Sequence, residues 1–240
     1  MSQLTKVLLW LIGVFALIIL IQYPLQQTMD SWQTWSLPLA GKTIVLDPGH
    51  GGVDGGAVGS DKTQEKEITL KVSKMVRDYL QQAGATVYLT RDGDYDLAGE
   101  DTKGLSRRKS EDIQKRVDFI EEKNADLFLS IHLNALTDKR WKGAQTFYYP
   151  GREENERFAK AIQSEIIRNL ENTKREALAI HQIFVLKYAE ATSALVEIGF
   201  LSNDEELALL QSDTYQRKMA ASIYQGILRY QTDELTLSEN

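Results

Sequence analysis

The sequence predicts a single α/β domain in which helices flank a mostly parallel, twisted sheet of about six strands. Short apolar runs rich in β-branched residues alternate along the chain with longer segments whose apolar residues recur at helical spacing. Such alternation is typical of βαβ units with right-handed crossovers, and therefore of parallel strands. Of the 240 residues, roughly 190 remain for this domain once a membrane segment and a tail are set aside, which suits one core.

An uncharged apolar segment, Val7–Ile21, precedes the domain. A spanning helix needs about 17–25 residues, and Gln22 and Tyr23 can extend this one. We therefore expect one N-terminal transmembrane helix, a signal anchor over residues 1–23. A cleaved signal peptide is the first alternative, although no small-x-small cleavage site follows, and a buried core helix is the second. Anchor and signal peptide both put the domain outside the cytoplasm.

The folded domain is expected at 42–232, after a polar linker at 24–41 and before a disordered tail at 233–240. Strands are predicted at six apolar runs, which are 43–47, 86–90, 127–131, 144–149, 183–186 and 194–198. Helices are predicted at five amphipathic segments, which are 64–83, 111–123, 155–170, 204–210 and 215–230. The long polar segment 91–110 is expected to be a functional or mobile loop.

The first strand and helix illustrate the reasoning. Ile44–Leu46 is apolar with two β-branched members, and Pro48 ends the strand because proline cannot donate to a ladder. In the helix at 64–83, five apolar residues recur at helical spacing and Gly84 follows as a cap. The five residues are Ile68, Val72, Met75, Val76 and Leu80.

Composition limits the possible functions. The net charge is −6 and no basic stripe carries interleaved aromatic residues, which argues against nucleic-acid binding. The chain has no cysteine, so disulfides, thiolate ligands and a cysteine nucleophile are excluded. Any metal site must use histidine, carboxylate and water.

Two of the three histidines, His50 and His132, each follow a predicted buried strand. Because the carboxyl ends of parallel strands lie along one edge of a sheet, the two imidazoles can converge there. Two carboxylates could join them. Glu65 begins the helix after His50, and Glu197 interrupts the apolar strand at 194–198, where an unpaired charge would be costly.

Two imidazoles and one carboxylate, with a position open for water, form the ligand set of catalytic zinc hydrolases. Such a metal lowers the pKa of its water and polarises the scissile carbonyl, while a second carboxylate moves the proton. We interpret Glu65 as the third ligand and Glu197 as the general base. Spacing alone leaves the reverse assignment open.

Each candidate also has an ordinary structural explanation. Glu65 could be a first-turn acid near the positive end of a helix dipole, and Glu197 could pair with an arginine such as Arg116. Asp47 and Asn134 flank the two histidines and are candidates to orient them, although turn chemistry explains both equally well. His181 has no partner that the sequence identifies.

Four ordered motifs carry a family resemblance, namely DPGHGGVDGGAVG at 47–59, Glu65–Lys66, SIHLNA at 130–135 and LVEIGFLSN at 195–203. Together they resemble the zinc-dependent N-acetylmuramoyl-L-alanine amidases of the Amidase_3 family, over about 43–230. The resemblance implies zinc on His50, Glu65 and His132, with Glu197 catalytic. It also implies hydrolysis of the amide between the muramic acid lactyl group and L-alanine of peptidoglycan, with no cofactor beyond the metal.

Further segments, including WSLPLAGKTIVLDPGH, KGLSRRKSEDIQKRV and QTFYY, resemble a subgroup of sporulation and germination amidases. This likeness implies a role in forming muramic δ-lactam in spore cortex. The expected partners are peptidoglycan and, through the N-terminal helix, a membrane. The need for an activator protein and the oligomeric state stay open.

Alternatives to this function are another cell-wall zinc hydrolase, such as a peptidase or a deacetylase, and a non-catalytic wall-binding or structural protein. Arg107, Arg108 and Arg116 are candidates to contact carboxylates of the substrate or to form structural pairs. We favour the structural role for Arg116.

Overall fold

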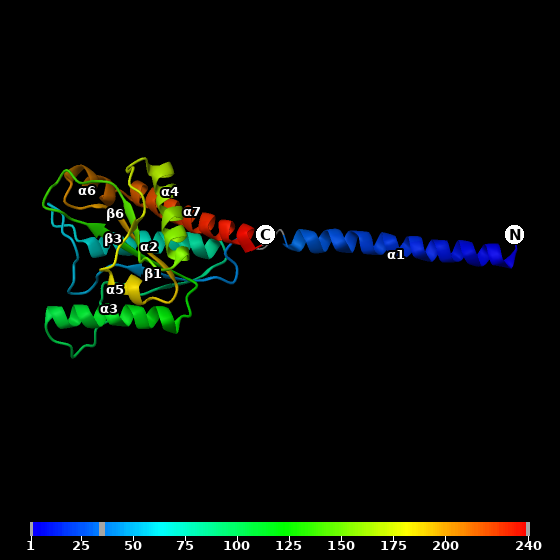
Figure 1. Cartoon of the computed structure of the whole chain (residues 1–240), viewed down its shortest axis with the longest axis horizontal. Helices are drawn as coiled ribbons and strands as arrows, with labels where there is room; N and C mark the ends of the chain where they lie inside the picture. The colour runs from blue at the N-terminus through cyan, green and yellow to red at the C-terminus, as the bar shows by residue number, and fades with distance from the viewer. Residues whose placement is uncertain (1, 34–36, 239–240) are drawn as a thin grey trace. The chain divides into compact units, whose positions relative to one another are not determined.

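The computed structural model describes residues 2–33 and 37–238, with side chains for 2–19 and 37–232. The chain divides into two compact units, Met1–Leu37 and Pro38–Asn240. Figure 1 shows the second unit as a sheet with helices on both faces.

The N-terminal unit contains one helix, α1 (Gln3–Gln33). It includes the predicted anchor Val7–Ile21 and continues through 24–33, which the sequence predicts as linker; residues 34–36 of that linker lie outside the described residues. A search of the described residues found no helix long and apolar enough to cross a membrane. The predicted transmembrane helix is therefore not supported by the structure.

Six strands form one sheet in the order β2-β1-β3-β6-β4-β5. They are β1 (Thr43–Pro48), β2 (Thr86–Leu89), β3 (Leu127–Asn134), β4 (Gln145–Tyr148), β5 (Leu178–Ala179) and β6 (Thr192–Phe200). All neighbours are parallel except β4 and β6, which are antiparallel, so the sheet is mixed. Residues 135–144 connect β3 to β4 without a crossover helix, and β4 runs in the opposite direction.

Helices cover both faces of this sheet (Figure 1). One face packs against α2 (Glu65–Gln82), α4 (Glu153–Leu170), α6 (Asp204–Gln211) and α7 (Asp213–Ser238). The other face packs against α3 (Leu105–Glu122) and the short α5 (Phe184–Tyr188). The predicted α/β class and strand number are therefore confirmed.

Three predicted boundaries differ from the structure. The apolar run predicted as a strand at 183–186 instead forms the N-cap and first residues of α5, since a run this short does not distinguish strand from helix. The sixth strand of the sheet is β5. The predicted loop 91–110 ends early because α3 begins at Leu105. The tail predicted at 233–240 has helical backbone as far as Ser238, and residues 239–240 lie outside the description.

Side chains alternate between the two faces of the sheet along each strand, and this alternation decides which of them face α3 and α5. Val45, Phe128 and Leu195 join the apolar cluster beneath α3 and α5. Two residues further along each strand, the same face carries Asp47, Ser130 and Glu197. His132 follows Ser130 by two residues and is the register partner of Glu197. The sheet therefore presents polar groups side by side at one edge.

Candidate metal centre

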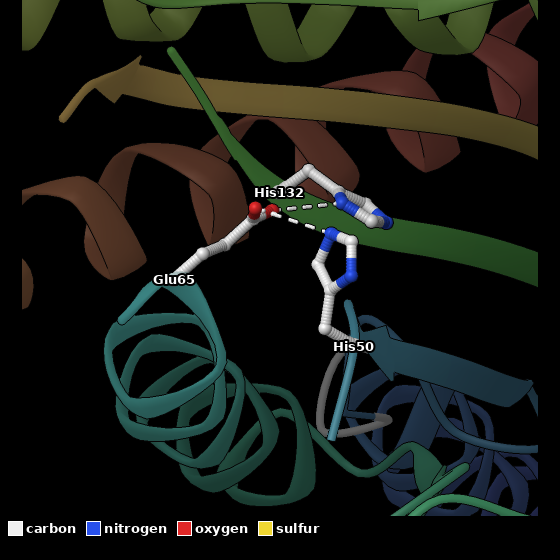
Figure 2. Close-up of side chains that lie close together, drawn as sticks. All are labelled: His50, Glu65 and His132. Carbon is white, nitrogen blue, oxygen red and sulfur yellow. Dashed lines mark hydrogen bonds and ion pairs between the residues drawn. The ribbon is translucent and has the colours of Figure 1, made fainter. Parts of the chain in front are cut away.

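Three predicted site residues converge at that edge (Figure 2). His50, Glu65 and His132 offer ligand atoms that lie within 4.8 Å of one another. Glu65 Oε2 lies 3.1 Å from His50 Nε2, and Glu65 Oε1 lies 2.9 Å from His132 Nδ1. The two imidazole rings meet edge to face at 79°, with centroids 5.0 Å apart. These residues come from three separate elements and could hold one metal ion.

His50 reaches this point through a sharp turn after β1. Its backbone has φ of 62°, in the left-handed region that few non-glycine residues adopt. A Cβ on the neighbouring Gly49 would lie 2.4 Å from His132 Cε1, and one on Gly56 would lie 2.5 Å from Glu65 Oε2. Glycine at both positions therefore permits the close approach of the three side chains.

Glu65 is the first residue of α2 and is only 2% exposed. Besides the two imidazoles, the backbone N–H groups of Ala57 and Leu133 donate to its carboxylate, at 2.7 and 2.8 Å. Burial alone would raise the pKa of Glu65, but hydrogen bonds and charge from His132 and His50 hold it well below its usual range. The carboxylate is therefore ionised at neutral pH, as a metal ligand must be.

Asp54 is a site residue that the sequence reasoning missed. Its carboxylate lies 2.9 Å from His50 Nδ1 and 3.1 Å from Lys109 Nζ. Burial would raise the pKa of Asp54, but His50 and Lys109 lower it to about 2. A carboxylate on one ring nitrogen orients the other toward the metal position. An acid four residues after His50 in the same glycine-rich loop was the available signal.

The donor set fits a divalent metal of the zinc type. Two ring nitrogens and one carboxylate oxygen are nitrogen and oxygen ligands that zinc accepts, and three protein ligands leave a coordination position open. Burial lowers the pKa of His50, whereas its hydrogen bonds and proximity to Glu65 and Asp54 outweigh this effect and raise it. A metal cation bound beside Glu65 would displace the proton from the imidazole of His50.

Glu197 faces the same edge but lies outside the cluster of three. Its Oε2 atom is buried and has no hydrogen-bond partner among the described residues. Burial raises the pKa of Glu197 to about 7, with the neighbouring histidines opposing the shift and Glu65 adding to it. A carboxyl group with a pKa near neutrality is suited to accept and return a proton.

A cavity of about 330 Å³ opens beside these groups. His50, His132 and Glu197 contribute to its lining from the sheet side. Ile113 of α3 and Phe184 of α5 contribute from the helices. The cavity therefore joins an apolar wall to the titratable cluster, as substrate sites commonly do.

Two alternative pairings considered from the sequence do not occur. Arg116 forms buried ion pairs with Asp47 and Asp112, so it is not the partner of Glu197. Asp47 accepts hydrogen bonds from Thr90 Oγ1 at 2.6 Å and Ser130 Oγ at 2.7 Å, and contacts neither histidine directly. The structural role favoured for Arg116 agrees with these contacts.

The other candidates lie apart from the cluster. His181 is exposed and packs edge to face on Tyr149, with centroids 5.7 Å apart. Arg108 pairs with Asp96, whereas the side chain of Arg107 has no hydrogen bond or ion pair with any described residue. The side chain of Asn134 likewise makes no hydrogen bond within the described part of the chain.

Known proteins resemble this chain in sequence. A family model described as N-acetylmuramoyl-L-alanine amidase matches residues 44–229. The germination-specific N-acetylmuramoyl-L-alanine amidase of Bacillus subtilis strain 168 is 53% identical over 234 residues, 98% of each chain.

Solved structures show the same likeness. The CwlD amidase from Clostridioides difficile, solved in complex with the GerS lipoprotein, has a TM-score of 0.79 and 40% identity, covering 80% of this chain and 100% of that one. The amidase AmiC2 of Nostoc punctiforme has a TM-score of 0.69 and 32% identity, covering 81% and 99%.

Proposed function

The chain belongs to the N-acetylmuramoyl-L-alanine amidase family, and we propose that it hydrolyses the amide between the lactyl group of muramic acid and the L-alanine of peptidoglycan stem peptides. The observation that carries this proposal is the His50–Glu65–His132 cluster beside Glu197, whose buried Oε2 atom has no hydrogen-bond partner among the described residues. The cluster suits a metal, and Glu197 suits proton transfer.

We propose zinc as the metal, held by His50, Glu65 and His132. When bound, it would polarise the scissile carbonyl and make water a better nucleophile near neutral pH. Glu197 then accepts a proton at Oε2 as the carbon–oxygen bond forms. The same residue returns that proton to the alanine nitrogen as the carbon–nitrogen bond breaks, so that the leaving group departs as an amine. Asp54 keeps the ring of His50 oriented throughout.

The biological setting that we propose is spore cortex. The Bacillus subtilis relative is named germination-specific and matches 98% of both chains at 53% identity, which supports a shared role. Removal of the stem peptide would prepare muramic acid for δ-lactam formation. A separate deacetylase would then be needed to free the sugar amine before the ring closes.

We further propose that the N-terminal unit directs the domain out of the cytoplasm, as a signal anchor or a cleaved signal. Between Val7 and Ile19, apolar side chains including Leu8, Trp10 and Phe15 are more than half exposed. Such a surface favours a non-aqueous environment or an export pathway. Fractionation of cells, followed by N-terminal sequencing of the mature protein, separates these outcomes: a start near residue 30 would exclude the anchor.

Muropeptide analysis tests the proposed reaction. Purified protein is incubated with peptidoglycan, with and without a chelator, and the products are identified by mass spectrometry. We expect free amino termini on L-alanine, intact N-acetyl groups, loss of turnover with chelator and recovery on addition of zinc.

Other products would overturn the proposal. Release of acetate would indicate a deacetylase, and cleavage within the stem peptide would indicate a peptidase. A folded protein that binds zinc but releases nothing from peptidoglycan would support a wall-binding role.

A further inference from the structure

The turn that carries His50 is held by an unusually complete set of donors. Every backbone carbonyl from Pro48 to Gly52 accepts a hydrogen bond, and three long cationic side chains supply most of them. These contacts are Arg91 Nε and Arg116 Nη1 to Pro48 O at 3.0 Å each, Arg91 Nη2 to Gly49 O at 2.9 Å, Thr69 Oγ1 to Gly49 O at 3.1 Å, Arg116 Nη2 to His50 O at 2.7 Å, Asp54 N to Gly51 O at 3.1 Å and Lys66 Nζ to Gly52 O at 2.8 Å.

Arg91 is the most unusual of these donors. It is 1% exposed, and no carboxylate among the described residues lies within ion-pair distance of it. Its guanidinium instead donates to backbone carbonyls and to the Thr69 hydroxyl. Burial and the charge of Arg116 lower the pKa of Arg91 to about 10, so it remains charged at neutral pH.

A buried charge without a counter-ion costs stability. A buried arginine at this position therefore indicates a function that a neutral side chain would perform less well. A guanidinium offers several donors in one rigid plane, and here that plane reaches Pro48 O, Gly49 O and Lys66 O at once. It thereby ties the turn after β1 to the first turn of α2, the two segments that carry His50 and Glu65.

The turn needs such restraint. His50 has a left-handed backbone, and Gly49, Gly51 and Gly52 surround it with residues of high conformational freedom. Arg116 adds a second connection, because its guanidinium joins the carbonyls of Pro48 and His50 to the buried carboxylates of Asp47 and Asp112. Together the two guanidinium groups restrain the backbone that carries the imidazole of His50.

We propose that Arg91 and Arg116 are positioning residues that hold the imidazole of His50 in its metal-binding orientation by clamping the carbonyls of Pro48, Gly49 and His50. The proposal rests on the metal site proposed above. Neither arginine touches the metal position, and each acts through the backbone.

The test compares Arg91→Lys and Arg116→Lys with Arg108→Lys. All three variants keep the positive charge and lose the planar fork. Arg108 is the control, because its guanidinium, like that of Arg116, joins a carboxylate to two backbone carbonyls, those of Gly99 and Thr102, but it is more exposed and contacts no residue of the turn. Zinc affinity is measured by competition with a chromogenic chelator, and thermal unfolding is followed in the metal-free protein.

We expect Arg91→Lys and Arg116→Lys to lose about 10- to 100-fold in zinc affinity, as when groups supporting a metal ligand are removed. Arg108→Lys should keep the wild-type affinity within about twofold. Equal zinc affinity in all folded variants, or an equal loss in Arg108→Lys, would overturn the proposal.

A second measurement reports on His50 without any metal. The chain has three histidines, so NMR spectra of protein labelled on histidine rings are simple to assign. In Arg91→Lys, the signals of His50 should broaden or split while those of exposed His181 remain sharp. Unchanged signals for His50 in a folded variant would contradict a positioning role.

Folding failure does not leave the proposal undecided. If Arg91→Lys does not fold, Thr69→Val removes one donor to Gly49 O with little change in shape, and Arg116→Lys remains available. Wild-type zinc affinity in both would reject the proposal. Because neither readout uses peptidoglycan, a failure of the proposed amidase activity would be seen separately from a failure of this inference.

Discussion

Glu65 and Glu197 lie at the same edge of the sheet but in opposite electrostatic surroundings. Glu65, at the start of α2, accepts hydrogen bonds from two backbone N–H groups and contacts two imidazoles. Glu197, in the middle of β6, has a buried Oε2 with no partner in the described structure. Burial raises the pKa of both, yet the pKa of Glu65 falls below its usual range while that of Glu197 rises to about 7.

The difference shows that the hydrogen-bond donors around a buried carboxyl group decide its protonation state more than its depth of burial does. Where several N–H groups and cationic rings surround the oxygens, the ionised form is favoured despite burial. Where they are missing, the group holds its proton until the pH is near neutral. One residue type is therefore held ionised in one position and titrates near neutral pH in the other.

Replacing Glu65 should have the largest effect. In Glu65→Gln we expect zinc affinity to fall by more than about 100-fold, because even residues that only support a ligand are worth 10- to 100-fold. Turnover of peptidoglycan should disappear with the metal. Metal content by mass spectrometry and product release measure both. Glu67→Gln is the control, because Glu67 is an exposed acid in the same helical turn. If Glu65→Gln bound zinc as tightly as the wild type, Glu65 would not be a metal ligand.

Replacing Glu197 should reduce turnover without removing the metal. A positioned acid–base group is worth about 10²- to 10⁴-fold in rate, so Glu197→Gln should lose activity in that range. Its zinc content should match that of the wild type. If Glu197→Gln kept more than a tenth of the wild-type rate, another group would have to carry the proton.

The same variant should change the pH dependence of stability in the metal-free protein. A carboxyl group whose pKa rises on folding binds its proton more tightly in the folded state, so its ionisation lowers stability as the pH rises from about 4.5 to about 7. Glu197→Gln should therefore be more stable than the wild type at pH 8, by up to about 3 kcal/mol, and nearly equal at pH 4.

Denaturant unfolding with chelator present measures this difference. His50, whose pKa is raised by Glu65 and Asp54, is present in both proteins, so the comparison reports on the substituted carboxyl group. The same stability difference at pH 4 and pH 8 would show that Glu197 has an ordinary pKa.

Asp47 provides the smallest test, because it is a third buried carboxyl group and, like Glu65, it accepts hydrogen bonds from nearby donors. Burial would raise its pKa, but Arg116 and the hydroxyls of Thr90 and Ser130 lower it to about 2. Its stabilisation is therefore complete above about pH 3.8 and is lost as the pH falls through about 2. Asp47→Asn should cost about 2 kcal/mol at pH 7 and much less at pH 2.

Urea unfolding at the two pH values measures the effect of Asp47→Asn. Asp78→Asn, on an exposed position of α2, serves as the matched control. An equal cost for Asp47→Asn at both pH values would mean that the carboxylate charge contributes nothing.

Much of the site could be predicted from the sequence alone. A strand, the point at which it ends and the helix that follows are encoded by neighbouring residues, so Ile44–Leu46, His50 and Glu65 could be interpreted together. The alternation of a strand likewise indicated that Glu197 interrupts an apolar run. Spacing still left the roles of Glu65 and Glu197 interchangeable, and only the resemblance to a family separated them.

The sequence by itself determined the α/β class, the positions of five of the six strands and the four residues that could meet at one sheet edge. Only the tertiary structure decided the antiparallel direction of β4, the helical state of residues 184–188, and the partners of Asp54, Arg91 and Arg116. The physical reason is distance along the chain. Periodicity is a property of adjacent residues, whereas the contact between Arg116 and His50 O joins positions 66 apart and depends on how β1 and α3 pack across the sheet.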